Sequence, residues 1–372
     1  MKKQLKRQQR WTAAIPNLTI GIDVGDRSSV LCGVNAAGQV TLRRTVSTTV
    51  QGLKRQLSGV DPARVVLEAG SHSPWISRLL KELGHEVIVA NPTELYGKKR
   101  RRKKNDRIDA EELARRGRAD PALLFPIEHR SEEVQTHLAV LQARDTAVQV
   151  RSKLIHHVRG STKPFGVRLP SCSAEAFARK AAEWIPDALK PALQPLLEQI
   201  AALTATIRGY DDQVSELAEK QYPQTALLRQ VTGVGALTAV AYVLVIENPE
   251  RFPRSRAVGN YLGLCPRLDD SGEWQPQLPI SKAGDEFIRR LLVGSAHYIL
   301  GPFGPDTDLR RWGLALAARG GKNAKKRAVV AVARKLSVLL LRLWVTAEVY
   351  EPLRQVRLAQ ERTDRRSQVA VR

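Results

Sequence analysis

The sequence contains too few cysteines and histidines for a disulfide-stabilised or zinc-binding protein. Three cysteines occur in 372 residues, at Cys32, Cys172 and Cys265, and this odd, widely spaced set provides neither a disulfide framework nor a pair of zinc ligands. The seven histidines include no pair at zinc-ligand spacing beside a C-x2-C sequence. We therefore expect a chain that works in a reducing compartment.

Long apolar segments are also missing. The longest candidate, residues 329–345, is interrupted by Arg334, Lys335 and Arg342, which argues against a membrane span. No apolar segment follows the basic N-terminus, so no signal peptide is expected. Together these absences predict a bacterial cytoplasmic protein without a membrane partner.

Acidic residues are outnumbered, because 60 Lys and Arg face 37 Asp and Glu for a formal net charge of +23. A chain this basic usually binds a polyanion, and nucleic acid is the first candidate. The alternatives are solvated basic faces and an anionic membrane surface, although no basic amphipathic helix with a bulky apolar face is evident. Aromatic residues make up 5%, so stacking of single strands is not expected to be the main binding mode.

Residues 17–127 show an alternating pattern typical of a mixed α/β domain, after a basic tail at residues 1–16. Three short β-type runs are followed by a buried-type strand, a helix, another strand and a helix that begins near Asp106. This order predicts an antiparallel meander followed by strand–helix alternation. The predicted ranges are 17–25, 28–35, 39–46, 63–70, 73–83 and 85–90.

The rest of the chain has a helical pattern, so the predicted fold class is α/β plus α. Residues 128–225 carry apolar side chains at coiled-coil spacing, which predicts two long helices. They are either antiparallel within one chain, or paired between chains, or packed on a domain as ordinary amphipathic helices. Residues 226–350 predict a second helical domain, and residues 351–372 a charged tail.

Acidic residues interrupt two apolar strands and begin one helix. Asp23 lies within IGIDVG and Glu68 ends VVLE, where an unpaired charge is costly. Asp106 and Asp109 are one helical turn apart, so they share a face. If the first and fourth strands are neighbours, these carboxylates can form a site for Mg²⁺ or Mn²⁺. The alternatives are a helix cap at Asp106, a turn at Asp23 and backbone hydrogen bonds at Glu68.

A run of basic residues immediately precedes this helix and would attract a phosphate backbone to the predicted metal site. A solvated loop is the alternative. The run consists of Lys98, Lys99, Arg100, Arg101, Arg102, Lys103 and Lys104.

These motifs resemble the IS110 family of bacterial insertion-sequence transposases, in particular its IS1111-like branch. The stretches IGIDVG, VVLEAG and KNDRIDAEELARRG resemble the family's RuvC-like domain with Asp, Glu, Asp and Asp at the active site. The later stretches QVTGVGALTAVAYVLVI, NYLGLCPRLDDSG and ISKAGDEFIRRLL resemble its C-terminal transposase domain. The resemblance covers nearly the whole chain, in the family's order.

The resemblance implies an RNase H-like fold in which Asp23, Glu68, Asp106 and Asp109 are catalytic metal ligands. It also implies a nucleophilic serine, which corresponds to Ser271 in CPRLDDSG. Such enzymes are DNA recombinases that join donor and target DNA under the guidance of a structured non-coding RNA, the bridge RNA. The serine forms a covalent link to DNA, assisted by metal in the RuvC-like site of a partner subunit.

Other residues have alternative roles. For Ser271 the alternative role is a turn serine, and Ser281 is interpreted as the N-cap of the next helix. The turn around Gly233 and Gly235 resembles a helix-hairpin-helix that grips phosphate, although a structural turn is the alternative. Candidate basic contacts are Lys282, Lys325, Lys326 and Arg327.

Three functions are consistent with these patterns: an RNA-guided recombinase, a metal-dependent endonuclease of the Holliday-junction-resolvase type, and a non-catalytic nucleic-acid binder. Tyr261 and Tyr298 lack the surrounding Arg-His-Arg pattern of a tyrosine recombinase. The coiled-coil spacing further predicts a homo-oligomer, a dimer or a tetramer on DNA.

Overall fold

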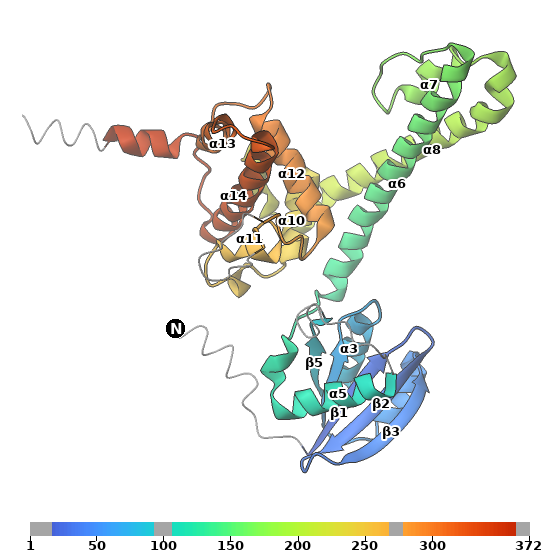
Figure 1. Ribbon diagram of the computed structural model, residues 1–372, viewed down its shortest axis with the longest axis vertical. Coiled ribbons are helices and arrows are strands. Elements are labelled where there is room, and N and C mark those ends of the chain that lie inside the picture. The colour runs from blue at the N-terminus through green and yellow to red at the C-terminus, as the bar shows by residue number, and fades with distance from the viewer. Residues whose placement is uncertain (1–16, 93–105, 268–277, 362–372) are drawn as a thin grey trace, which may run out of the picture. The chain divides into compact units, whose positions relative to one another are not determined.

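The computed structural model describes residues 17–92, 106–267 and 278–361, and gives the backbone but not the side chains of Asp106 and Arg107 (Figure 1). The chain divides into two compact units, Met1–Ser131 and Glu132–Arg372, which are described separately below. The basic run from Lys98 to Lys104 and the predicted nucleophile Ser271 lie outside the described residues.

The first unit is built on a five-stranded mixed sheet with the order β3-β2-β1-β4-β5. β1, β2 and β3 form the predicted antiparallel meander, while β4 and β5 run parallel to β1. The prediction of a mixed sheet with a meander is confirmed, and the first and fourth strands are neighbours. The strands are β1 (Leu18–Val24), β2 (Ser28–Asn35), β3 (Val40–Ser47), β4 (Arg64–Glu68) and β5 (Glu86–Ala90).

Helices cover both faces of this sheet. α2 (Val50–Leu57) and α3 (Ser73–Glu82) pack on one face, where the core includes Ile22, Leu67 and Ile76. α5 (Asp106–Ala119) lies across the other face, as Figure 1 shows. α2 was not predicted, because its polar sequence depends on a local cap in which the Thr49 side chain accepts a hydrogen bond from the N–H of Gly52 at 3.1 Å.

α5 approaches the sheet closely because glycines line the contact. A Cβ on Gly21 in β1 would collide with the backbone carbonyl oxygen of Ala110 in α5, and one on Gly117 in α5 would collide with Val66 in β4. Arg64, which is 2% exposed, fixes the end of the helix by donating from Nη1 to the carbonyl oxygen of Gly117 at 3.0 Å. The docking of α5 therefore depends on the absence of side chains at these positions.

Gly21→Ala is expected to destabilise the first unit by about 3 kcal/mol or more, because the collision is with backbone that cannot move aside. Gly59→Ala is the matched control, since no atom lies within 4 Å of a Cβ at Gly59 and its φ is not positive. That variant should unfold within about 1 kcal/mol of the wild type. Urea denaturation of both variants measures the difference, and equal midpoints would contradict the close approach of α5.

The second unit begins with two long helices, α6 (Glu132–Thr162) and α8 (Lys190–Glu216), which pair antiparallel within the chain. Arg144 Nε donates to Asp211 Oδ1 at 2.6 Å, and further along α6 the Arg151 Nη1 donates to Thr204 Oγ1 at 3.2 Å. The intrachain antiparallel pair left open by the sequence is observed, and the N-terminal part of α6 and the C-terminal part of α8 also pack on the helical domain. Since the apolar spacing is satisfied within the chain, it no longer argues by itself for a homo-oligomer.

The contacts between α6 and α8 differ in part from the predicted apolar spacing. Val148, Leu196 and Leu203 belong to that spacing but are only partly buried. The buried residues at these points are instead Ala147 and Arg151 of α6, and Leu197 and Thr204 of α8. Arg151 also pairs with Glu175 in the loop that precedes α7 (Phe177–Ala182). The paired polar groups take the place of apolar contacts in the middle of the two helices.

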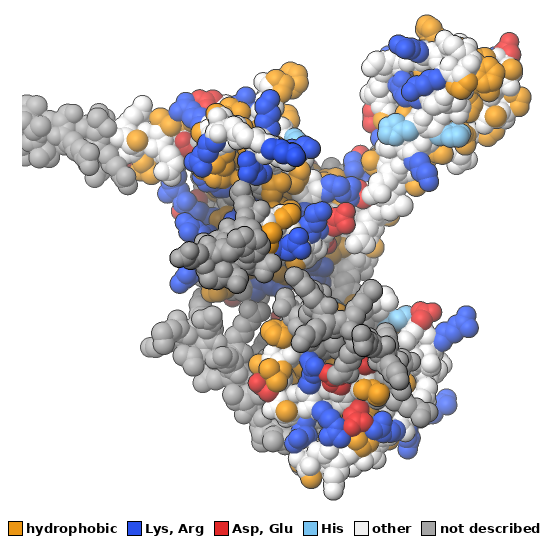
Figure 2. Space-filling model, in the orientation of Figure 1, with side chains coloured by type: hydrophobic (Ala, Val, Ile, Leu, Met, Phe, Trp, Pro, Cys, Tyr) orange, Lys and Arg blue, Asp and Glu red, His pale blue; other side chains and the backbone are white. Residues whose placement is uncertain are grey.

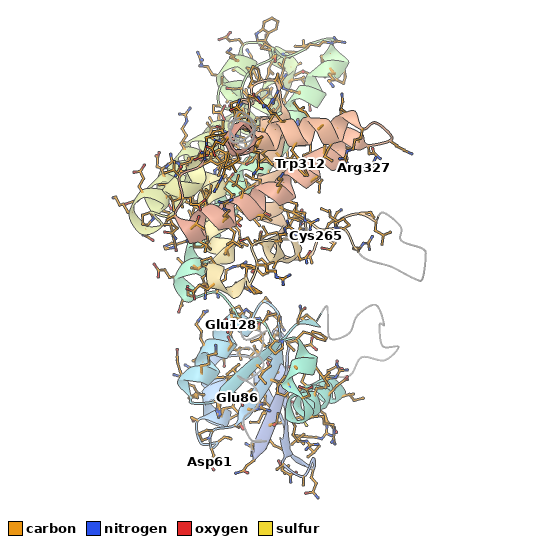
Figure 3. The ribbon with its side chains drawn as sticks, turned by 90° about the vertical axis from the view of Figure 1, so that its left-hand side faces the viewer. Asp61, Glu86, Glu128, Cys265, Trp312 and Arg327 are labelled. Carbon is orange, nitrogen blue, oxygen red and sulfur yellow. The ribbon has the colours of Figure 1, made fainter. Side chains whose placement is uncertain are left out.

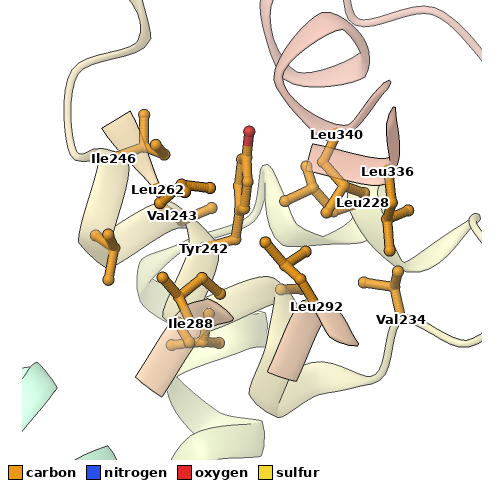
Figure 4. Close-up of a cluster of buried hydrophobic side chains, with 14 of the residues drawn as sticks. Leu228, Val234, Tyr242, Val243, Ile246, Leu262, Ile288, Leu292, Leu336 and Leu340 are labelled. Atoms are coloured by element: carbon orange, nitrogen blue, oxygen red, sulfur yellow. The ribbon is translucent and has the colours of Figure 1, made fainter. Parts of the chain in front are cut away.

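Six further helices of the described chain contribute to one core around the fully buried Tyr242, with Leu228, Ile288 and Leu336 in the same cluster (Figure 4). Residues 354–361 form another helical segment. The hydroxyl of Tyr242 donates to the carbonyl oxygen of Ser337 at 2.6 Å, and burial raises the pKa of this tyrosine well above its usual value. The helices are α9 (Thr225–Arg229), α10 (Ala236–Ile246), α11 (Ala257–Tyr261), α12 (Glu286–Leu300), α13 (Asp308–Ala318) and α14 (Ala324–Thr346).

Short helical turns connect the longer elements. They are η2 (Pro121–Leu124), η3 (Lys163–Phe165), η4 (Asp187–Leu189), η5 (Leu217–Gln221) and η6 (Pro249–Arg251). The predicted N-cap at Ser281 is wrong: α12 begins at Glu286, and Asp285 caps it by accepting from the N–H of Ile288 at 3.1 Å. No helix in the described part of the chain is long and apolar enough to cross a membrane.

Candidate active site and nucleic-acid surfaces

Asp23 and Glu68 lie on the same face of the sheet, at the same end of neighbouring strands. Ile22 of β1 pairs in parallel register with Leu67 of β4, and both side chains belong to the core on the α2 and α3 face. Because side chains alternate along a strand, the next residue of each strand points to the opposite face. Asp23 and Glu68 therefore project side by side from the face that α5 covers.

α5 brings its first turn to this end of the sheet. Ala110 and Ala114 pack against Gly21 of β1, while the later Gly117 lies near Thr19, so α5 runs antiparallel to β1. The first turn, which carries Asp106 and Asp109, is consequently directed toward the strand ends that carry Asp23 and Glu68. Side chains of the described members of this set are partly buried rather than fully exposed.

This set of carboxylates has the chemistry of a site for a hard divalent cation. Carboxylate oxygens are the preferred protein ligands of Mg²⁺ and Mn²⁺. Within the described side chains, no group of three or more Asp, Glu, His or Cys residues is close enough to hold a metal ion. The side chain of Asp106 is not among those described. The donor set fits a divalent cation, while the described side chains alone do not complete a coordination shell.

Ion pairs hold α5 in place beside the strands. Glu111 pairs with both Arg115 and Arg43, and the hydrogen bond from Arg115 lowers the pKa of this carboxyl below its usual value. Arg115 Nη1 also donates to the carbonyl oxygen of Gly38 at 3.0 Å, and Arg118 Nη1 donates to that of Ala36 at 3.1 Å. These contacts hold α5 against the turn between β2 and β3. β2 is the neighbour of β1, the strand that carries Asp23.

A hydrogen-bonded pair at the same edge of the sheet was missed by sequence reasoning. Asp26, in the turn after β1, lies with its Oδ1 at 3.1 Å from Nε2 of His72, which follows β4. Trp75 Nε1 donates to His72 Nδ1 at 3.1 Å, which leaves Nε2 to carry the proton toward Asp26. The signal available was the position of both residues just beyond the strands that bear Asp23 and Glu68.

In the second unit, the chain on either side of the Ser271 segment is held together as a short stem. Pro266 and Ile280 form an antiparallel bridge, the Arg267 N–H donates to the Pro279 carbonyl at 3.0 Å, and the Ser281 N–H donates to the Cys265 carbonyl at 2.8 Å. Exposed Lys282 follows directly, with its N–H on the Gly263 carbonyl at 3.1 Å. The structure thus anchors both ends of the segment that contains Ser271.

The structure describes two of the predicted phosphate-binding sites, the turn at Gly233 and the basic residues at the start of α14. Gly233 has a left-handed φ of 92° and lies beside Tyr298, in the turn that leads into α10. Lys325, Lys326 and Arg327 are exposed in the first turn of α14, and Arg327 is labelled in Figure 3. Basic side chains at a helix N-terminus oppose the helix dipole, so they do not serve helix stability.

The side chains of Arg289 and Arg290 form hydrogen bonds and an ion pair with other residues of the second unit. Arg289 Nη1 donates to the carbonyl oxygens of Ala283 and Gly284, which fixes the loop before α12. Arg290 forms a bidentate pair with Asp145 of α6, at 3.0 and 2.7 Å. Each of the two guanidinium groups therefore already has partners within the second unit.

A carboxylate-bearing mixed sheet joined to a helical domain that carries Ser271 defines the class of a DEDD transposase, and comparison with known families supports this class. A family described as a transposase, of the DEDD type of IS110, matches residues 20–161, and the IS116/IS110/IS902 transposase family matches residues 225–305. The chain therefore belongs to the IS110 family of insertion-sequence transposases.

Individual relatives agree with this assignment over most of their length. The chain is 28% identical to the transposase for insertion sequence element IS1111A of Coxiella burnetii, over 89% of this chain and 90% of that protein. It is 27% identical to a probable family 20 transposase of Pseudomonas aeruginosa, over 90% of this chain and 98% of that protein. It is 29% identical to the IS1328 transposase of Yersinia enterocolitica, over 76% of this chain and 84% of that protein. The chain is an insertion-sequence transposase, and its DEDD domain suggests the use of divalent metal.

Proposed function

We propose that the protein is an RNA-guided DNA recombinase that moves its insertion sequence through a covalent serine–DNA link. The observation that carries this proposal is the placement of Asp23 and Glu68 side by side beneath the first turn of α5, in a chain with both transposase domains. The strand order and the parallel β1–β4 pair favour an RNase H-like, or RuvC-like, fold for residues 17–127.

In this proposal Asp23, Glu68, Asp106 and Asp109 hold Mg²⁺ or Mn²⁺. Bound there, the cations supply charge neutralisation at the phosphate and favour the deprotonated nucleophile. The carboxylates would hold the cations at a fixed place relative to the sheet, and the α5 ion pairs keep the helix that carries two of these carboxylates from shifting. His72 orients Asp26 at the rim of the same site.

Ser271 is proposed as the nucleophile. Its hydroxyl oxygen attacks the phosphorus, the bond from phosphorus to one sugar oxygen breaks, and the serine proton leaves as that sugar oxygen becomes a hydroxyl. Attack by a sugar hydroxyl of the other DNA then reverses these changes and joins the strands. The anchored stem would present the serine, and Lys282 would stabilise the charge on the phosphate.

Basic surfaces are proposed to hold donor DNA, target DNA and a structured guide RNA. The run from Lys98 to Lys104 would contact strands at the metal site, and Lys325, Lys326 and Arg327 would contact a backbone at the end of α14. Figure 2 shows Lys and Arg side chains over the part of the second unit that includes α13 and α14. Donor and target must be held together during exchange, which favours a dimer or tetramer in the bacterial cytoplasm.

The functional division of the chain is proposed as follows. Residues 17–127 carry the metal site, residues 128–225 form the two-helix arm, and residues 226–350 carry the serine. Residues 1–16 and 351–372 were expected to be basic and charged tails, but residues 354–361 form a helical segment whose start is held by the hydrogen bond from the Gln355 N–H to Asp308. In the structure, the N-terminal part of α6 and the C-terminal part of α8 belong to the core of the six-helix domain, through Leu138, Leu141 and Val214. The arm is therefore continuous with that domain.

Reconstitution with purified components tests the proposal. Full-length protein is mixed with donor and target DNA and with RNA transcribed from the non-coding DNA that flanks the gene. Strand exchange is expected with RNA and Mg²⁺ together, and not after EDTA or ribonuclease treatment. Exchange that continues after ribonuclease would contradict RNA guidance, and exchange in EDTA would contradict the metal site.

A further inference from the structure

The second unit contains an open hollow of about 530 Å³ between the turn before α10 and the side of α12. Its volume is in the range of small-molecule sites. Its lining residues include none of the proposed metal ligands and none of the residues of the Ser271 stem. The residues that matter for its chemistry are Arg229, Gly233, Thr238, Ser295 and Tyr298, all of which line it.

Two largely buried residues that carry hydroxyl groups line the hollow, and their hydroxyls have no partner among the described residues. Thr238 is 7% exposed and Ser295 is 5% exposed. Neither side chain forms a hydrogen bond with another residue in the described ranges. A hydroxyl that lines an open hollow and has no protein partner is available to a ligand with hydrogen-bonding oxygens.

The entrance of the hollow is cationic and aromatic. Arg229 is exposed and forms no ion pair with any residue that the structure describes. Arg290 also lines the hollow, but Asp145 already neutralises its charge. Tyr298 is 46% exposed, and its ring borders Gly233. The start of α10 at Gly235 has no side-chain cap, so its first N–H groups add to the donors.

We infer that this hollow binds one unpaired nucleotide of a DNA or RNA strand. The phosphate is held by Arg229 and by the hydroxyls of Thr238 and Ser295, and the base stacks on Tyr298. A phosphodiester provides acceptor oxygens and negative charge for Arg229 and the two hydroxyls. An unpaired base provides an exposed aromatic face for the ring of Tyr298. The inference rests on the proposed action on nucleic acid, and it adds the recognition of an unstacked base.

Binding of short single-stranded DNA and RNA oligonucleotides that contain 2-aminopurine tests the site on the full chain. Tyr298→Ala is expected to weaken single-strand binding about tenfold and to abolish the fluorescence quenching that stacking causes. Tyr298→Phe keeps the ring and should bind within about twofold of the wild type. Arg229→Ala should reduce the dependence of affinity on salt by about 0.7 in log–log slope.

Arg208→Ala is the matched control for Arg229→Ala, because Arg208 is exposed on α8 and has no partner among the described residues. It should leave the quenching unchanged. Equal binding by Tyr298→Ala and the wild type, an equal loss on duplex DNA, or no single-strand binding at all would each overturn the inference. These measurements need no strand exchange, so the recombinase proposal can fail or succeed independently of them.

Discussion

Asp23→Asn is expected to abolish DNA strand breakage, with a loss of about a thousandfold or more, while DNA binding remains close to normal. The substitution keeps the size of the side chain and removes the charge that would hold a divalent cation at the end of β1. A thousandfold loss corresponds to about 4 kcal/mol of transition-state stabilisation, which is what a lost metal ligand is expected to cost. Glu68→Gln should behave in the same way, because Glu68 ends the neighbouring strand on the same face.

Asp61→Asn is the matched control. Asp61 is exposed and precedes β4, so it lies at the opposite end of the sheet from Glu68, and it is labelled in Figure 3. Cleavage of labelled donor DNA is measured over a range of Mg²⁺ concentrations, with binding measured by gel shift in Ca²⁺. A variant at Asp23 that cuts at the wild-type rate would remove the basis for the metal site, and a similar loss in Asp61→Asn would indicate a general effect of lost charge.

Ser271→Ala is expected to eliminate both the covalent protein–DNA adduct and strand exchange, again by about a thousandfold or more. Alanine lacks the oxygen that attacks phosphorus, and no other group can form the same ester. The adduct is detected as labelled DNA that migrates with the protein on denaturing gels. Binding of donor DNA should stay within about twofold of the wild type, because the hydroxyl contributes little to affinity before the reaction.

Ser281→Ala is the internal control, since Ser281 is exposed at the other side of the same stem, where its Oγ accepts from the Ala283 N–H at 3.4 Å. That variant should retain both the adduct and exchange. If DNA is cut without an adduct in the wild type, the chain acts instead as a metal-dependent endonuclease of the resolvase type, and Ser271 has no catalytic role.

The sheet and the positions of its acidic residues were predictable from the sequence. β-Branched runs marked each strand, and Asp23 and Glu68 were conspicuous because a charge within an apolar run requires a partner. Their adjacency was conditional on the strand order, which local patterns do not determine. The β1–β4 pairing supplies that missing step, and it depends on long-range contacts between residues far apart in the chain.

Other features depended on tertiary contacts that the sequence pattern did not reveal. Arg151 is buried between the long helices, where its Nη atoms donate to Thr204 and Glu175, and an apolar spacing along the sequence does not reveal that burial. α13 was not predicted, since its amphipathic face is recognisable only against α14. Ser281 matched the pattern of a helix cap, but the following loop extends to Asp285 before the helix starts.

The length of the two-helix arm, formed by α6 and α8, determines how far from the six-helix domain the protein can contact DNA. α6 has 31 residues, and at 1.5 Å per residue such a helix is about 46 Å long. One turn of duplex DNA rises about 35 Å. The first part of α6 belongs to the core of the six-helix domain, so the arm extends only from about Asp145 to Thr162. That part is roughly 26 Å long, shorter than a turn of the double helix, and a rotation of about 10° at its base would displace its tip by roughly 4 Å. Small adjustments around the Asp145–Arg290 pair, near its base, are thus converted into movements larger than the spacing between neighbouring base pairs.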